Sequence, residues 1–510
     1  MITLTARQVA DAVNGQLNAA PEVLVTGPVV VDSRKVVAGA LFVALPGEHA
    51  DGADFAEGAL ADGATLVLAA RELAGENGPL PTVVVADVQA ALGDLARFVL
   101  AEVRAKNPNL RVIATTGSVG KTTTKDLIAQ LIRTGDDGFG GETIAPIGSF
   151  NNEIGMPLTV LTVDENTQFC DFEMGADRPG NITYLAQIAP PNVGIVLRVG
   201  TAHMEGFGSR EGIANAKAEM LAELVPDGVG VLNADDHRVA AMASRVTGPD
   251  QRVITFGRAE EADIRAEDIT VDALGRAAFT MRIKAAVAEK IVNTSRVTPG
   301  SGISTMMAVI ADQRYPVQLT IVGEHHVSNA LAAATAAMLV GIPPLTVCAR
   351  LGAITEMSPH RMAVTERPDG ITVIDDAYNA NPESMGAALK SLAIVAGRER
   401  RSVAVLGEML ELGEDQRAGH EKMGRLAVRL GIKKLIVVGP GAAPMFDAAQ
   451  QEGSWGGEAV AAADLDAARA ILNETLHNGD VVLVKASNGS GLWKLGDELA
   501  AGTLGLQVAS

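Results

Sequence analysis

The segment Arg111-Val-Ile-Ala-Thr-Thr-Gly-Ser-Val-Gly-Lys-Thr-Thr-Thr-Lys125 decides the fold, because it joins an apolar run to a glycine turn and then to a helical pattern. Residues 112–114 suit a buried parallel strand, and the apolar residues of 127–132 recur at helical spacing. Gly117 and Gly120 allow backbone angles at which successive N–H groups converge on phosphate oxygens at the positive end of a helix. The segment therefore predicts a phosphate-binding strand, loop and helix.

Two side chains of this loop carry the expected chemistry. Lys121 should reach the β- and γ-phosphates of a nucleotide, and the Thr122 hydroxyl should hold Mg²⁺. Thr115 stands where the full P-loop pattern has glycine, so only the second half of that pattern is present. The alternative is an ordinary βα turn with an exposed lysine, but the order of strand, Gly-Lys-Thr and helix favours the phosphate site. The predicted nucleotide-binding residues of the loop are Gly117, Ser118, Val119, Gly120, Lys121, Thr122 and Thr123.

The composition is that of an acidic globular protein with several cores. Its 510 residues are too many for one core, and 47% of them are hydrophobic. With 61 acidic and 42 basic residues the net charge is −19, which argues against nonspecific binding to nucleic acid or anionic lipid. An anionic substrate would therefore need a local basic pocket. Cys170 and Cys348 are the only cysteines and no apolar run is long enough to span a membrane, so we expect a cytoplasmic protein without membrane insertion.

The order of apolar and polar runs predicts an α/β protein of three domains. Residues 1–107 should form a small N-terminal α/β domain, and residues 108–360 a central nucleotide-binding domain with a P-loop-type, mostly parallel sheet. The βα alternation resumes over residues 361–510, which predicts a C-terminal Rossmann-like domain. We expect hinges at residues 107–109 and near Pro359.

Polar residues follow several of the apolar runs. Asp32-Ser-Arg34 could bind a phosphate or a nucleotide head group, and turn chemistry explains it equally well. Glu173 ends a strand on the same sheet edge as the phosphate loop, where a carboxylate can complete a Mg²⁺ shell, although alone it would be a surface residue. His203 follows another core strand, and Lys217 lies in a helical stretch where a solvated charge is the plain interpretation. Asn329 opens an alanine-rich helix, where it could read an adenine edge or cap the helix.

Together these motifs resemble the Mur ligases, which are ATP-dependent amide-bond ligases of peptidoglycan precursor synthesis. Within that family, residues 151–155, 378–384 and 407–413 resemble the members that add D-alanyl-D-alanine to a UDP-N-acetylmuramoyl-tripeptide. The resemblance covers nearly the whole chain and keeps the order of the motifs. It is carried by Thr116–Thr123, Glu173–Gly175, His203 with Glu205, Lys217, Asn233–Asp236, Gly323–Asn329, Arg361 and Asp375–Pro382.

The resemblance implies a role for each matching residue. Lys121, Lys217 and His203 would be catalytic, with Lys217 carbamylated to give an anionic oxygen ligand for the second of two Mg²⁺ ions. The implied metal ligands are Thr122, Glu173, His203 and Lys217. The implied ATP contacts beyond the loop are Asn329, Arg361 and Asp375. The implied substrate contacts are Ser33 and Arg34 for the uridine nucleotide, and Asn151, Asn152, Tyr378, Asn379 and Asn381.

Two positions depart from the family pattern. Asn488 stands where we expect a basic residue, which places a contact to a substrate carboxylate in question, and Glu408 stands where we expect aspartate. The implied enzyme is a monomer that forms an acyl phosphate and then an amide. The alternatives are a sister ligase that adds a single amino acid, a folate-polyglutamate ligase, a nucleotide-binding scaffold without ligation, and a P-loop kinase. The third peptide residue, diaminopimelate or lysine, and the base that deprotonates the amine are left open by the sequence.

Overall fold

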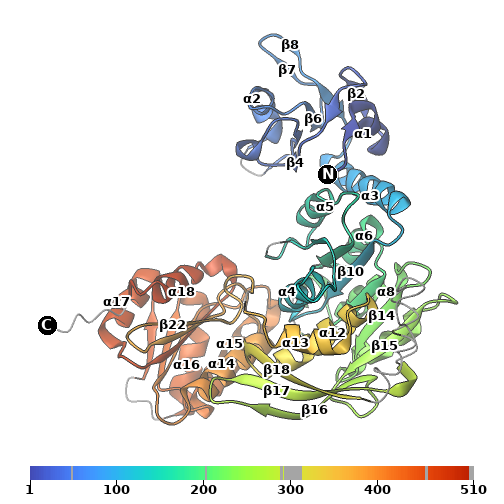
Figure 1. Ribbon diagram of the computed structural model, residues 1–510. Coiled ribbons are helices and arrows are strands. Elements are labelled where there is room, and N and C mark those ends of the chain that lie inside the picture. The colour runs from blue at the N-terminus through green and yellow to red at the C-terminus, as the bar shows by residue number, and fades with distance from the viewer. Residues whose placement is uncertain are drawn as a thin grey trace.

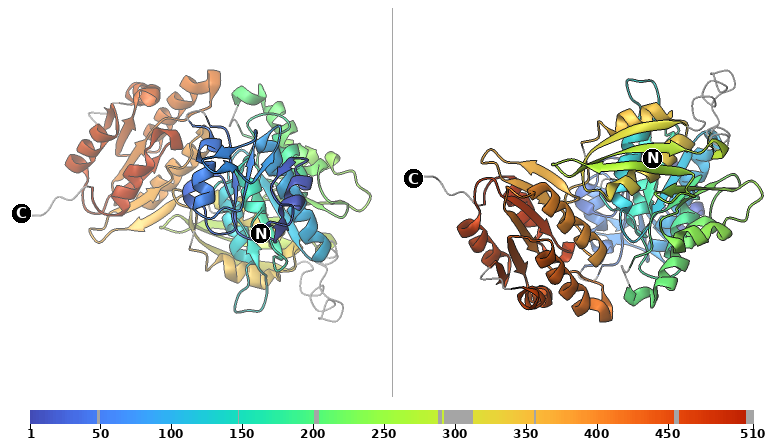
Figure 2. Two further views of the ribbon diagram at one scale, coloured as in Figure 1. Left: turned by 90° about the horizontal axis from the view of Figure 1, so that it is seen from above. Right: turned by 90° about the horizontal axis from the view of Figure 1, so that it is seen from below.

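The computed structural model describes residues 1–504 except 48–49, 147, 201–203, 288–290, 292–312, 356 and 454–457. The chain forms three domains in sequence order, each built on one large sheet (Figure 1). The C-terminal domain lies beside the N-terminal and central domains in the views from above and below (Figure 2). The expected α/β architecture of three domains is confirmed. Among the described residues no helix is both long and apolar enough to cross a membrane.

The N-terminal domain is built on a five-stranded sheet whose only antiparallel pair is β2 with β9. Its strands, in spatial order, are β2 (Gln16–Asn18), β9 (Thr82–Val84), β6 (Leu66–Ala69), β5 (Leu41–Val43) and β4 (Val29–Val30). Its helices are α1 (Ala6–Ala12) and α2 (Ala56–Ala61), and two short pairs, β1 (Leu4–Thr5) with β3 (Leu24–Val25) and β7 (Ala74–Gly75) with β8 (Gly78–Pro79), complete it.

The central domain has a nine-stranded sheet that is parallel from β11 to β16 and antiparallel from β16 to β18. The phosphate-loop strand β10 lies inside the parallel part, so its carboxyl end meets those of its neighbours at one edge. The spatial order is β11 (Thr143–Ile144), β12 (Phe169–Glu173), β10 (Arg111–Thr116), β13 (Val193–Val196), β14 (Val229–Asn233), β15 (Arg252–Gly257), β16 (Ile264–Val271), β17 (Arg276–Ile283) and β18 (Arg314–Val322).

Helices cover both faces of this sheet, because its strands carry apolar side chains on both faces. One face packs against α4 (Lys121–Ile132), α12 (His326–Leu339) and α13 (Pro344–Leu351). The other packs against α5 (Gly155–Val160), α6 (Asn181–Ile188) and α8 (Arg210–Ala222). The short helices α7 (Met204–Phe207) and α9 (His237–Ala241) flank α8.

The C-terminal domain is a six-stranded sheet with helices on both faces, as expected for a Rossmann-like fold. The strand order is β19 (Ala363–Glu366), β20 (Thr372–Asp375), β24 (Val481–Lys485), β21 (Ser402–Leu406), β22 (Lys434–Val438) and β23 (Ala459–Ala462), with only β19 antiparallel. One face packs against α14 (Pro382–Ala396), α15 (Gln416–Arg429) and α16 (Ala443–Glu452), and the other against α17 (Leu465–Thr475) and α18 (Trp493–Ala500).

Helix α3 (Val88–Lys106) lies at the junction between the N-terminal and central domains (Figure 1). One continuous apolar core joins its residues to the N-terminal sheet and to α5 and α6. At its end, Arg104 donates a hydrogen bond to the Pro190 carbonyl at 2.6 Å, and the Asn107 side chain donates to the Thr167 carbonyl at 2.9 Å. These bonds tie the segment expected to be a hinge to the central domain.

Asp171 on β12 is a fully buried carboxyl group whose two oxygens have no hydrogen-bond partner among the described residues. Burial raises its pKa well above the usual value, because the folded protein disfavours the charged form of this group. In the unfolded chain the carboxyl group titrates near pH ~4. Folding therefore becomes less favourable as the pH rises above that value, until the raised pKa of the folded state is passed.

Replacing Asp171 with asparagine should remove this pH dependence, because the amide does not titrate. We expect the free energy of unfolding of Asp171→Asn, relative to wild type, to increase by up to about 1.4 kcal/mol per pH unit as the pH rises above ~4, until the raised pKa of the folded state is passed. Urea unfolding of both proteins at a series of pH values measures the effect. A stability difference that is independent of pH would contradict the assignment.

Candidate active site

The phosphate loop connects β10 to α4, and its backbone conformation requires glycine at position 120. Gly120 is the N-cap of α4 with φ 84°, and a Cβ at this position would lie 2.5 Å from the Asn329 side-chain oxygen. Glycine is therefore required both by its backbone angle and by the close approach of α12. The Lys121 ammonium folds back over the loop and donates to the Gly117 carbonyl at 2.9 Å. Desolvation lowers the pKa of Lys121, because the ammonium is enclosed by protein and shielded from water.

Oxygen atoms from three segments meet beside the loop. The Thr122 hydroxyl donates to the Glu173 carboxylate at 2.7 Å and lies 2.7 Å from the Ser149 hydroxyl. The Asn151 amide donates to the other Glu173 oxygen at 2.6 Å. Hydroxyl and carboxylate oxygens are the donors that Mg²⁺ prefers, so the donor chemistry of Thr122 and Glu173 fits a magnesium site.

Lys217 on α8 is buried, with 4% of its surface exposed, so the interpretation as a solvated helix charge is wrong. Its ammonium has no hydrogen bond or ion pair to any residue in the described part of the chain. Burial, with repulsion from Lys121, lowers the pKa of Lys217 to about 7. A substantial fraction of this amine is therefore neutral at neutral pH. His203, its expected partner at the second metal, lies outside the described residues.

The first turns of α12 pack against the phosphate loop. Asn329 packs its side-chain oxygen against Gly120, and its amide nitrogen lies 3.2 Å from the His326 ring nitrogen. Asn329 is thus not an N-cap, since α12 begins at His326 with His325 as its N-cap. Burial lowers the pKa of His325 to about 4, so this ring is neutral at physiological pH.

Arg361 brings the C-terminal domain onto the phosphate loop. Its guanidinium donates to the Thr122 and Ser149 hydroxyls, each at 3.1 Å. The same group lies 4.1 Å from the centroid of the Tyr378 ring, in cation–π geometry. Arg361 therefore joins the motif after β20 to the oxygen cluster of the central domain.

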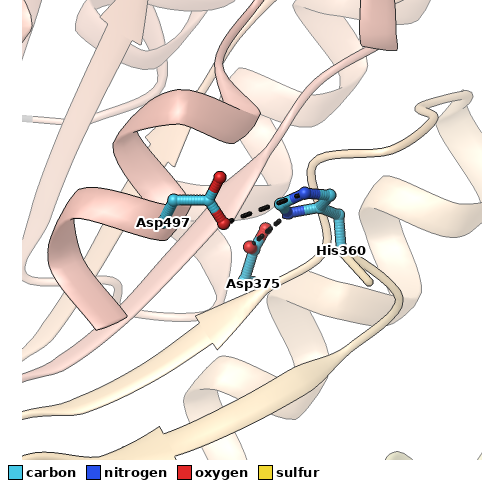
Figure 3. Close-up of side chains that lie close together, drawn as sticks. All are labelled: His360, Asp375 and Asp497. Carbon is cyan, nitrogen blue, oxygen red and sulfur yellow. Dashed lines mark hydrogen bonds and ion pairs between the residues drawn. The ribbon is translucent and has the colours of Figure 1, made fainter. Parts of the chain in front are cut away.

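Asp375, an expected nucleotide contact, instead faces His360 (Figure 3). Its carboxylate lies 2.6 Å from the His360 Nδ1, and the other ring nitrogen lies 3.8 Å from Asp497 on α18. Burial raises the pKa of Asp375 despite this contact. The next residue, Asp376, does line the cavity and pairs with Lys485 at 2.5 Å. Asp375 is thus not among the residues that line the cavity.

These groups surround a cavity of about 1210 Å³ between the central and C-terminal domains. Its wall carries both basic and acidic side chains, and the basic ones come from both domains. Among them, Lys121 and Arg361 lie beside the phosphate loop, where they can meet an anionic substrate. The predicted site residues that line it are Gly117, Ser118, Val119, Gly120, Lys121, Thr122, Thr123, Asn151, Asn152, Glu173, Lys217, Asn329, Arg361, Tyr378, Asn379 and Asn381.

Two predicted residues lie apart from the cavity, in the N-terminal domain. Ser33 and Arg34 belong to a single 3-10 turn, Ser33–Lys35, capped by Asp32. The Arg34 guanidinium is exposed and pairs with the Asp32 carboxylate at 2.9 Å, which lowers the pKa of Asp32 to about 2. The exposed arginine on a capped turn is free of the cavity between the central and C-terminal domains.

Several cavity residues are not among the predicted site residues. Ser149 and Lys485 were recognisable by position, since one lies in the glycine-rich segment before Asn151 and the other ends a core strand. Lys390 and Lys422 project from α14 and α15 and had no local signal. Asn488, where a basic residue was expected, also lines the cavity, whereas Glu408 accepts a hydrogen bond from Gln416 at 2.8 Å.

Comparison with known proteins gives matches along the whole chain. Residues 28–99 match "Mur ligase family, catalytic domain", residues 115–337 "Mur ligase middle domain" and residues 360–488 "Mur ligase, glutamate ligase domain". The UDP-N-acetylmuramoyl-tripeptide–D-alanyl-D-alanine ligase of Mycobacterium tuberculosis is 44% identical over 98% of both chains. The corresponding ligase of Escherichia coli K12 is 33% identical over 86% of both.

Solved structures agree with the sequence matches. MurF from Acinetobacter baumannii superposes with a TM-score of 0.81 at 26% identity, covering 98% of this chain and 99% of that one. MurF ligase from Thermotoga maritima in complex with ADP gives a TM-score of 0.74 at 25% identity, covering 94% and 98%. Because sequence identity and fold agree over nearly its full length, the chain belongs to the Mur ligase family.

Proposed function

We propose that this protein joins D-alanyl-D-alanine to a UDP-N-acetylmuramoyl-tripeptide, converting ATP to ADP and phosphate. The observation that carries the proposal is the cavity in which Arg361 of the C-terminal domain touches Thr122 beside the phosphate loop. A ligase needs such a shared cavity, because nucleotide and acceptor must meet. The identity of 44% to a ligase of this printed specificity, over 98% of both chains, supports the choice of substrates.

The chemistry follows from the charges that must be brought together. The terminal carboxylate of the tripeptide attacks the γ-phosphate of ATP, giving an acyl phosphate and ADP. Both reactants are anions, so the central task is charge neutralisation by Lys121 and Arg361, acting by position and electrostatics. The free amine of the dipeptide then attacks the activated carbonyl, and phosphate leaves.

Two Mg²⁺ ions would supply further neutralisation when bound. Thr122 and Glu173 would hold the first. His203 and Lys217 would hold the second, with Lys217 carbamylated. Support for the carbamate is the burial of Lys217 and its pKa of about 7, because only the neutral amine reacts with carbon dioxide.

The remaining assignments extend the same proposal. Ser33 and Arg34 would receive the uridine nucleotide, and Asn329 would contact adenine from its place beside Gly120. We place the domain boundaries at residues 107/108 and 360/361, within the runs between the three sheets. The use of ATP and a UDP-linked precursor points to a cytoplasmic reaction.

Phosphate release from the purified protein tests the function. The protein is incubated with Mg-ATP and the UDP-N-acetylmuramoyl-tripeptide, with D-alanyl-D-alanine present or omitted. We expect release that requires the dipeptide, and a product mass equal to the pentapeptide precursor. Release with a single amino acid in place of the dipeptide would indicate a sister ligase, and no release with any acceptor would indicate a nucleotide-binding scaffold.

A further inference from the structure

Helix α4 contains a second lysine, Lys125, which has no part in the proposed chemistry. Its side chain is buried, with 2% exposed, and its ammonium pairs with the Asp126 carboxylate at 2.8 Å. The same ammonium donates to the backbone carbonyls of Pro146 at 2.6 Å and Gly148 at 3.0 Å. A buried ammonium needs such partners, because an unpaired charge in the interior is strongly unfavourable.

The two carbonyls that Lys125 binds flank the start of a segment that touches the proposed magnesium site. Ser149 follows Gly148 directly and contacts Thr122, and Asn151 donates to Glu173. Lys125 therefore holds the backbone at the start of segment 148–151, while the side chains of Ser149 and Asn151 contact the oxygen cluster.

Asp126 holds a different part of the chain. Its carboxylate accepts hydrogen bonds from the Ser358 backbone N–H at 2.8 Å and the Ser358 hydroxyl at 3.0 Å. Ser358 stands three residues before Arg361, which itself donates to Thr122 and Ser149. Asp126 thus binds the segment through which the chain enters the C-terminal domain.

One oxygen atom joins the two sets of contacts. The Asp126 Oδ1 forms the ion pair with the Lys125 ammonium and also accepts the hydrogen bond from the Ser358 hydroxyl. Contacts that share one oxygen are not independent, so a change at Ser358 alters the partner that positions Lys125. The contacts close a ring that runs from Ser358 through Asp126, Lys125 and Ser149 to Arg361.

We propose that Lys125 and Asp126 are a positioning pair that couples the docking of the C-terminal domain to the order of segment 148–151 at the oxygen cluster. The inference rests on the proposed function only where it concerns the effect of the coupling on turnover. The coupling itself is a property of the folded chain and can be measured without turnover. A pair that is merely structural would stabilise α4 without linking the two segments.

Amide hydrogen exchange measures the coupling directly. Suitable reporters are the N–H groups of Ile154 and Gly155, which donate to the Asn152 side chain, and of Gly175, which donates to the Asn151 carbonyl. Ser358→Ala removes one hydroxyl and no buried charge, so folding should be preserved. We expect it to speed exchange at the three reporters about 3-fold or more, although Ser358 does not contact them.

Three further variants make the result decisive. Lys125→Met should speed the same amides more strongly, and the double variant should show less than the product of the two single effects, because both act through Asp126. Ser358→Thr keeps the hydroxyl and should restore the wild-type rates. Lys106→Met removes an exposed pair with Glu165 at 2.6 Å and should leave the reporters unchanged.

Kinetics give a second readout. In Ser358→Ala we expect a lower kcat with little change in the KM for ATP, because the segment acts on the arrangement of the site rather than on nucleotide binding. Unchanged exchange at the reporters in Ser358→Ala, or fully multiplicative effects in the double variant, would overturn the coupling. Failure of the phosphate-release experiment alone would overturn the proposed function and leave the exchange result standing.

Discussion

Replacing Lys121 with methionine is expected to lower the kcat of ligation by about 10³-fold, the range seen when one preorganised charge-stabilising group is removed. The methionine keeps the unbranched stem and removes the ammonium that lies 2.9 Å from the Gly117 carbonyl. Without that charge the tripeptide carboxylate and the γ-phosphate repel each other during transfer. Phosphate release at saturating substrates measures the loss.

The matched control is Lys106→Met, which makes the same chemical change on α3, away from the cavity. It should keep the wild-type rate. Thermal denaturation of both variants should give midpoints close to that of the wild type, since neither removes an apolar core residue. A Lys121→Met enzyme within tenfold of the wild-type kcat would refute the role assigned to Lys121.

The second large effect is expected at Lys217. Lys217→Ala should reduce turnover by about 10³-fold, because the proposed carbamate would supply an anionic metal ligand that alanine lacks. Added bicarbonate should not restore the variant. Lys217→Arg should be equally inactive, since it keeps the positive charge but cannot form the carbamate. Near-normal activity in either variant would refute the carbamate.

The pKa of Lys217 gives this prediction a pH dependence in the wild type. The neutral amine predominates above the pKa of about 7, and the ammonium predominates below it. After removal of dissolved carbon dioxide, activity should therefore return faster at pH ~8 than at pH ~6 when both samples receive the same concentration of dissolved carbon dioxide. Stopped assays at timed intervals after this addition measure the rates, and equal recovery at both pH values would contradict the proposed chemistry.

The sequence predicted the parts of the site that depend on local order. Strand, Gly-Lys-Thr and helix are contiguous, so the phosphate loop was visible in one segment. Glu173 was placed beside Thr122 because parallel strands end on the same sheet edge, and the 2.7 Å contact agrees with this. The three-domain α/β architecture followed from apolar runs that alternate with helical patterns.

Other features depend on packing between distant segments and gave no local signal. Lys217 occupies an ordinary helical position, and only the sheet and α8 together show that it is buried. Asp375 shares a motif with Tyr378, yet it faces His360, whose other ring nitrogen lies 3.8 Å from Asp497 on α18. The ring of contacts through Lys125 joins segments more than 200 residues apart, and no spacing rule predicts it.

Helix α3 also determines where this chain can be divided. Its apolar residues belong to a core shared with α5 and α6, and its last turn is bonded to the central domain. A fragment that starts at residue 108 would leave this face of the central domain in contact with water and prone to aggregation. A chimera that exchanges the N-terminal sheet between relatives should therefore be joined before Val88 rather than at the domain boundary, so that α3 keeps its contacts with α5 and α6.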